Sequence, residues 1–168
     1  MPDDSSPLSR RDVLRMGLGA GVALTLDRLP SFGFETRQGA LIQRPIPSSG
    51  ERLPIVGIGT ARNYENPAPD AIPVLRDVLR QFPELGGRVI DTAPAYGRAE
   101  AVVGDLLAEL KNRDKYFIAT KVSVRGGGGR DAAVAQMEQS LQRLRTDHID
   151  LMQVWNLSSP ELLFPILD

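Results

Sequence analysis

The 168-residue chain is 42% hydrophobic and 24% charged, which is ordinary for a globular protein of one domain. Its formal net charge of −1 gives no indication of a nucleic-acid partner or of binding to an anionic surface. There is no cysteine, which excludes a disulfide framework and a thiolate metal site. The single histidine, His148, argues against a classical zinc site, so we expect no metal.

The first 38 residues differ in character from the rest of the chain. The basic segment Ser9–Arg15 precedes an uncharged stretch, Met16–Leu26, which is about half as long as a membrane-spanning helix. This layout is typical of a signal peptide. The pair Arg10 and Arg11 resembles the twin-arginine (Tat) export motif, although Val13 stands where phenylalanine is usual.

We therefore expect residues 1–38 to be a leader and residues 39–168 to be the folded part of the chain. The resemblance implies recognition by the Tat export machinery and a periplasmic location. No clear Ala-x-Ala cleavage site precedes residue 38, so an uncleaved leader that anchors the protein to the membrane stays open. A disordered or amphipathic N-terminal arm is the alternative.

From Ala40 onward, strand and helix patterns alternate. A hairpin is expected first, with strands at 40–44 and 52–54 around a turn rich in proline, serine and glycine. Further strands are expected at 55–60, 89–91, 116–122 and 149–155. Helices with one apolar stripe are expected at 70–82, 98–112 and 131–145, and a final helix is expected after Ser158 or Ser159. The glycine tract 126–129 is interpreted as a flexible loop.

The alternation predicts a parallel sheet with right-handed crossovers, that is, an α/β fold. The chain supplies about four β/α units, whereas a (β/α)8 TIM barrel has eight units in roughly 250 residues. An open α/β sheet is the alternative, but the glycine fingerprint of the doubly wound class is absent, because Arg62 stands where a third glycine would follow Gly57 and Gly59. We therefore predict the N-terminal half of a TIM barrel preceded by a β-hairpin.

Candidate catalytic residues fall at the ends of two strands. Asp91 ends one strand, Tyr96 lies in the loop that follows it, and Lys121 lies near the end of the next. A lysine ammonium close to a phenol stabilises the phenolate, which suits the phenol for proton transfer near neutral pH. An aspartate beside the lysine keeps it charged. The alternative is a plain Asp91–Lys121 ion pair with a tyrosine that only packs.

Several blocks resemble the aldo/keto reductases in order and spacing over about residues 40–168: Gly57-x-Gly59-Thr60, Asp91-Thr92-Ala93-x-x-Tyr96-Gly97-x-x-Glu100, Thr120-Lys121, and Ser140-Leu141-x-x-Leu144-x-x-Asp147-x-Ile149-Asp150-Leu151. The resemblance implies a (β/α)8 barrel that reduces aldehyde or ketone carbonyls with NADPH. It makes Tyr96 the general acid, Lys121 the cation beside it and Asp91 the carboxylate that holds Lys121. It also implies that Gly59, Thr60 and Asp91 bind the cofactor.

The sequence departs from the family pattern at the end of the fourth strand. Trp155 stands where a histidine is expected, and Asn156 follows it. Indole donates one hydrogen bond but cannot titrate, so Trp155 and Asn156 are expected to bind substrate without relaying a proton. His148 is no substitute, because it lies near the opposite end of the same strand.

The second departure is the missing half of the barrel, which in the family holds most of the cofactor. We therefore expect a truncated reading frame or a fragment that is inactive alone and does not bind NADPH in the family manner. The alternative is a non-catalytic half-barrel that serves in binding or self-association after losing the catalytic histidine.

Overall fold

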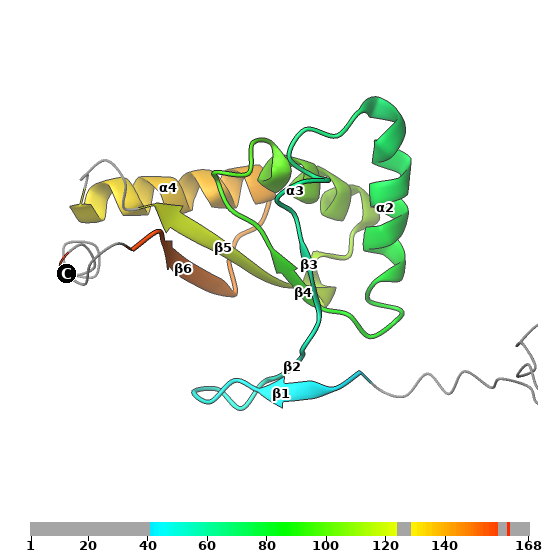
Figure 1. Cartoon of the computed structure of the whole chain (residues 1–168), viewed down its shortest axis with the longest axis horizontal. Helices are drawn as coiled ribbons and strands as arrows, with labels where there is room; N and C mark the ends of the chain where they lie inside the picture. Colours follow the sequence, from blue (N-terminus) through cyan, green and yellow to red (C-terminus); the bar gives the residue numbers. More distant parts are fainter. Residues whose placement is uncertain (1–40, 124–128, 158–160, 162–168) are drawn as a thin grey trace, which may run out of the picture. The chain divides into compact units, whose positions relative to one another are not determined.

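The computed structural model describes residues 41–123, 129–157 and 161, all within one unit, Gln38–Asp168 (Figure 1). The predicted leader, most of the glycine tract and almost all of the expected final helix lie outside the described residues. The division between leader and folded part therefore stays a prediction. Within the described ranges, no helix combines the length and the apolar character that a membrane span requires.

The described residues form two sheets. Strand β1 (Gln43–Pro45) pairs antiparallel with β2 (Arg52–Pro54), which gives the predicted hairpin. Four parallel strands form the second sheet in chain order: β3 (Gly57–Gly59), β4 (Val89–Asp91), β5 (Phe117–Ser123) and β6 (Leu151–Trp155). Each strand lies beside the one that precedes it in sequence, which is the order of a (β/α) barrel. The predicted fold class, part of a TIM barrel, is confirmed.

Three α-helices connect these strands: α2 (Ile72–Gln81), α3 (Ala99–Leu110) and α4 (Gly129–Leu144). Short 3-10 turns precede α2 at Pro69–Ala71 and follow α3 at Arg113–Lys115. Helices α3 and α4 lie side by side along the sheet, with α2 beside α3 (Figure 1). The core is the apolar layer that includes Leu75, Leu79, Ile90, Val102, Val103, Leu106, Leu107, Tyr116, Ile118 and Leu144.

Several element boundaries differ from the sequence prediction by a few residues, among them those of β3 and α4. The expected strand 55–60 pairs only over β3, because the Ile55 backbone N–H instead donates to the Ile42 carbonyl and extends the hairpin. Helix α4 begins at Gly129, two residues before the predicted start at Asp131. Asp131, which was expected to start this helix, therefore lies inside its first turn.

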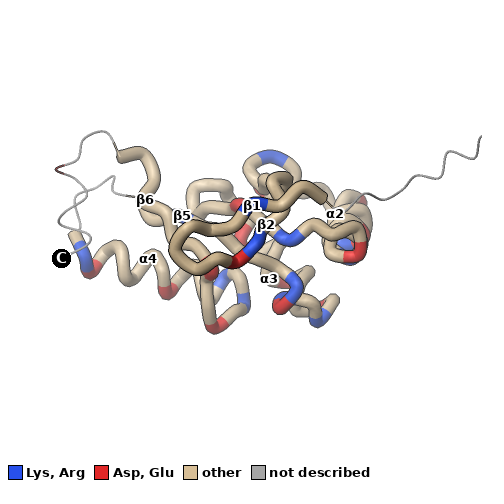
Figure 2. The backbone as a smooth tube through the Cα atoms, turned by 90° about the horizontal axis from the view of Figure 1, so that it is seen from below, with Lys and Arg blue, Asp and Glu red and all other residues tan. Residues whose placement is uncertain are grey.

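Basic and acidic residues are interspersed along the described backbone (Figure 2), and exposed ion pairs such as Arg88–Glu51 join them.

Candidate active site

Lys121 is held by three acceptors at the C-terminal end of β5. Its Nζ donates to both carboxylate oxygens of Asp91, at 2.7 and 2.8 Å, and to the Thr92 carbonyl at 2.8 Å. The sheet register explains the contact, since Asp91 lies opposite Ala119 and residues two apart on a strand share a face. The Lys121 side chain is 9% exposed, and a buried ammonium is tolerated only when its protons find partners. All three protons of this ammonium are satisfied.

Tyr96 lies between Lys121 and Trp155. The Lys121 Nζ is 5.1 Å from the centroid of the Tyr96 ring, within the range of a cation–π contact. The rings of Tyr96 and Trp155 meet edge-to-face, with centroids 6.4 Å apart and an interplanar angle of 80°. The structure thus brings together all four predicted catalytic residues. Because Lys121 donates its protons to Asp91 and Thr92, its contact with the Tyr96 ring is one of charge and not a hydrogen bond.

The turn that carries Tyr96 is fastened to the loop after β3. Gly97 has a φ of +54°, which favours glycine, and a Cβ at this position would lie 2.9 Å from the Glu65 carbonyl oxygen. That same carbonyl accepts the Arg98 backbone N–H at 2.8 Å. Glu65 is therefore a positioning residue for Tyr96. Sequence reasoning missed it, and no local signal could have found it, because the interaction uses its main chain.

The predicted cofactor residues divide into two kinds. Gly59 is exposed, with open space where a Cβ would stand, and the Asp91 side chain is 43% exposed, so both fit the border of a bound group. Thr60 is fully buried, and its N–H and hydroxyl both donate to the Asp91 carbonyl, at 3.1 and 3.0 Å. In this arrangement Thr60 holds the Asp91 main chain. A contact between Thr60 and a cofactor stays a prediction.

The other singled-out residues lie where the sequence suggested. Asn156 is exposed directly after Trp155, with a φ of +58°. The His148 side chain is exposed near the opposite end of β6, where its Nδ1 is 2.6 Å from the Asp147 carboxylate. The hydrogen bond with His148 lowers the pKa of Asp147.

The described part of the chain contains no group of three or more His, Asp or Glu residues placed to hold a metal ion.

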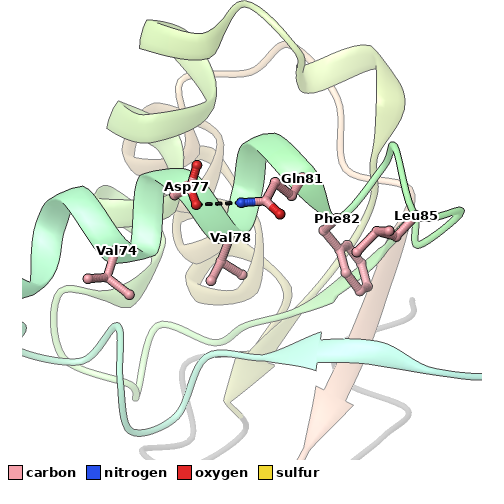
Figure 3. A pocket seen from close by; sticks show the side chains of 6 residues that line it. All are labelled: Val74, Asp77, Val78, Gln81, Phe82 and Leu85. Atoms are coloured by element: carbon pink, nitrogen blue, oxygen red, sulfur yellow. Dashed lines mark hydrogen bonds between the residues drawn. The ribbon is translucent and has the colours of Figure 1, made fainter.

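A pocket lies away from these residues, on the outer side of α2 (Figure 3). Its volume is about 230 Å³, and it is lined by Val74, Asp77, Val78, Gln81, Phe82 and Leu85. The Gln81 amide donates to the Asp77 carboxylate along its rim (Figure 3). None of the predicted catalytic or cofactor residues lines this pocket.

The four-stranded parallel sheet places Asp91 and Lys121 near the carboxyl ends of neighbouring strands, with Tyr96 in the loop between them, and comparison with known proteins shows which family shares this pattern. Residues 55–159 match the pattern of the aldo/keto reductase family. This segment is more than half of the chain, and the chain belongs to that family. The same match supports the barrel fold, so the resemblance read from the sequence is confirmed at the level of the family.

Individual relatives cover part of the chain. Methylglyoxal reductase YeaE of Escherichia coli is 43% identical over 112 residues, which are 65% of this chain and 38% of that protein. Aldo-keto reductase YhdN of Bacillus subtilis is 38% identical over 100 residues, 54% of this chain and 29% of that protein. The chain thus spans about a third of the length of these curated relatives.

Solved structures give the same result. An aldo-keto reductase from Klebsiella pneumoniae in complex with NADPH superposes with a TM-score of 0.60 and 28% identity, covering 74% of this chain and 44% of that one. A thermostable aldo-keto reductase in complex with the inhibitor epalrestat gives a TM-score of 0.61 and 28% identity, covering 76% and 48% of the two chains.

Proposed function

We propose that this chain carries the proton-donating side of an NADPH-dependent reductase that acts on aldehyde or ketone carbonyls. The observation that carries the proposal is the contact of Tyr96 with a buried Lys121 ammonium that Asp91 holds. This cluster lies at the carboxyl ends of parallel strands, where barrel enzymes act. The family match, the methylglyoxal reductase relative and the NADPH-bound Klebsiella structure support the same class of reaction.

Reduction of a carbonyl requires a hydride at its carbon and a proton at its oxygen, and NADPH supplies the hydride when it is bound. In the proposed mechanism the Tyr96 hydroxyl gives its proton to the carbonyl oxygen as negative charge develops there. The fixed charge of Lys121 stabilises the phenolate that remains. Asp91 keeps Lys121 charged and in place. Trp155 orients the same oxygen through its indole N–H without transferring a proton.

Gly59 and Asp91 are the residues proposed to border the cofactor. Their fit rests on the open space beside Gly59 and the partial exposure of the Asp91 carboxylate. Gly59→Ala would fill that space at no cost to neighbouring atoms. In a mixture of this chain with the C-terminal half of the Klebsiella relative, we expect it to weaken NADPH binding, as measured by quenching of tryptophan fluorescence, while the unfolding midpoint of the chain stays the same.

Tyr96→Phe provides the direct test. The 168-residue chain is assayed for NADPH consumption with methylglyoxal, both alone and mixed with the C-terminal half of the Klebsiella relative, which supplies the strands that this chain does not cover. We expect turnover in the mixture, and a loss of about 10²–10⁴-fold in Tyr96→Phe, because the positioned acid is removed. Tyr64→Phe is the matched control, since its phenol is buried and has no hydrogen-bond partner among the described residues. Equal activity of Tyr96→Phe and Tyr64→Phe under saturating NADPH would exclude the acid role, and no turnover in any mixture would exclude the reductase.

Self-association without catalysis is the second candidate function. Among the described residues, β3 and β6 border the parallel sheet and each pairs on one side. Nearby Ile55, Val56 and Leu151 are 55%, 61% and 45% exposed, although parallel sheets are normally covered on both faces. We expect residues 39–168 to sediment as dimers or larger species, to bind a hydrophobic dye and to lack measurable NADPH affinity. A compact monomer that binds NADPH with micromolar affinity would contradict this.

A further inference from the structure

Glu100 is a buried carboxylate that the proposed reaction does not use. It lies in the first turn of α3, four residues after Tyr96, and is 1% exposed. Its Oε1 accepts the Thr120 hydroxyl proton at 2.6 Å, and its Oε2 accepts the Arg143 Nε–H at 2.6 Å. One side chain therefore connects the helix after the Tyr96 turn with both β5 and α4.

A buried ion pair such as Glu100–Arg143 is not by itself evidence of added stability. Burying a carboxylate costs free energy, and apolar residues of similar volume are often as stable or more stable in its place. The Arg143 side chain is 33% exposed and also donates to the buried Ser140 hydroxyl, so the pair is anchored on α4. Gly104, one turn after Glu100, has no room for a side chain because the Arg143 carbonyl lies against it. This close approach of α3 and α4 brings Arg143 to Glu100.

The residue that Glu100 holds is the direct neighbour of Lys121. Successive side chains on a strand point to opposite faces, so anchoring the Thr120 hydroxyl on the helix side fixes the rotation of β5 and turns Lys121 toward Asp91. Thr120 is fully buried. At the other end, the Tyr96 carbonyl accepts the Ala99 backbone N–H at 2.9 Å, which couples the start of α3 to the tyrosine turn.

We propose that Glu100, acting through the Thr120 hydroxyl, is a positioning residue that sets the placement of Tyr96 relative to Lys121. Arg143 compensates the charge of Glu100. This role rests on the proposed function, in which Tyr96 and Lys121 act together. The contact between the Tyr96 ring and the Lys121 ammonium, however, can be observed in the protein without turnover.

Trp155 allows that arrangement to be observed directly. It is the only tryptophan in the sequence and it touches the Tyr96 ring, so its fluorescence and its near-ultraviolet circular dichroism report on Tyr96. Thr120→Val removes the hydroxyl at nearly constant volume, and Thr120→Ser retains it. Asp105→Asn is the control on α3, where Asp105 makes an exposed ion pair with Arg145.

In the full chain we expect Thr120→Val to alter the Trp155 signals, and Thr120→Ser and Asp105→Asn to leave them as in the parent. In the turnover assay with the Klebsiella half, kcat of Thr120→Val should fall about 10- to 100-fold at unchanged KM, as for a small misplacement of reacting groups. Glu100→Gln keeps an acceptor for the Thr120 hydroxyl, so it should keep the Trp155 signals while lowering the unfolding midpoint.

A purely structural role gives a different result. Thr120→Val would then lower only the unfolding midpoint, with the Trp155 signals and kcat per folded molecule unchanged, and the proposal would be overturned. If Thr120→Val does not fold, Thr120→Ala removes the same hydroxyl and is judged by the same criteria. If the parent shows no turnover, the proposed function fails, and the Trp155 signals of the Val and Ser variants still decide the positioning role.

Discussion

Replacing Gly97 by alanine measures how firmly the loop after β3 fixes the Tyr96 turn. A φ of +54° costs an L-residue about 1–2 kcal/mol relative to glycine. The new Cβ would lie 2.9 Å from the Glu65 carbonyl oxygen, closer than real Cβ contacts allow, so one of the two segments must shift. That shift stretches the hydrogen bond from the Arg98 N–H to the same carbonyl, whose net worth is about 1 kcal/mol. Together the two terms predict a destabilisation of about 2–3 kcal/mol.

The assay is urea unfolding of the 168-residue chain, followed by Trp155 fluorescence. Gly59→Ala is the matched control, because a Cβ there meets nothing within 4 Å, and we expect its free energy of unfolding to stay within about 0.5 kcal/mol of the parent. The native Trp155 emission should shift in Gly97→Ala, since Tyr96 moves with the turn. Equal unfolding midpoints for the two variants would refute the reasoning about the Glu65 contact.

Three further predictions concern pH, the fourth strand and the leader. Burial raises the pKa of Tyr64 to about 12 and raises that of Tyr116 further above its usual range, whereas both phenols ionise near pH 10 in the unfolded chain. The folded state thus favours the neutral phenols, so this stability is fully present below pH 10 and is lost as the pH rises toward 12. Urea midpoints at pH 9 and 11 should show the loss, and Tyr64→Phe should reduce it. Trp155→His should raise activity toward simple aldehydes, and no gain with an unchanged fold would mean that Trp155 does not occupy the histidine's place. Changing Arg10 and Arg11 to lysine should prevent export, and a mutant found in the periplasm as readily as the parent would contradict the Tat assignment.

The fold and the central ion pair could be predicted because they follow from local periodicity and sheet geometry. The spacing of apolar residues predicts α3 and α4, and the alternation of strands and helices predicts a parallel sheet. In such a sheet the carboxyl ends of neighbouring strands meet at one edge, so Asp91 and Lys121 had to lie close together. The resemblance to the aldo/keto reductases rests on the same residues and on their order along the chain.

Contacts made through the main chain could not be predicted. Arg113, for example, donates to the Tyr116 and His148 carbonyls and to the Asp150 carboxylate, which fixes the start of β6. Nothing in the residues around Arg113 indicates those partners. Likewise, the buried Thr60 hydroxyl donates to the Asp91 carbonyl, and only the approach of β3 to β4 determines this contact.

With Trp155 at the end of β6, the site has one fewer group that could supply a proton. A histidine at the end of β6 would offer a second titratable group near the carbonyl oxygen, whereas indole offers one fixed donor. If the proposed reaction is correct, proton supply then depends on Tyr96 alone, and its rate depends on how constantly Lys121 stays against the ring. A site with one acid tolerates less movement of that acid than a site with two. Two contacts hold this geometry: the Tyr96 turn is bonded to the Glu65 carbonyl, and Thr120 is bonded to Glu100. Among substitutions remote from the substrate, we therefore expect those that break these two contacts to reduce turnover most.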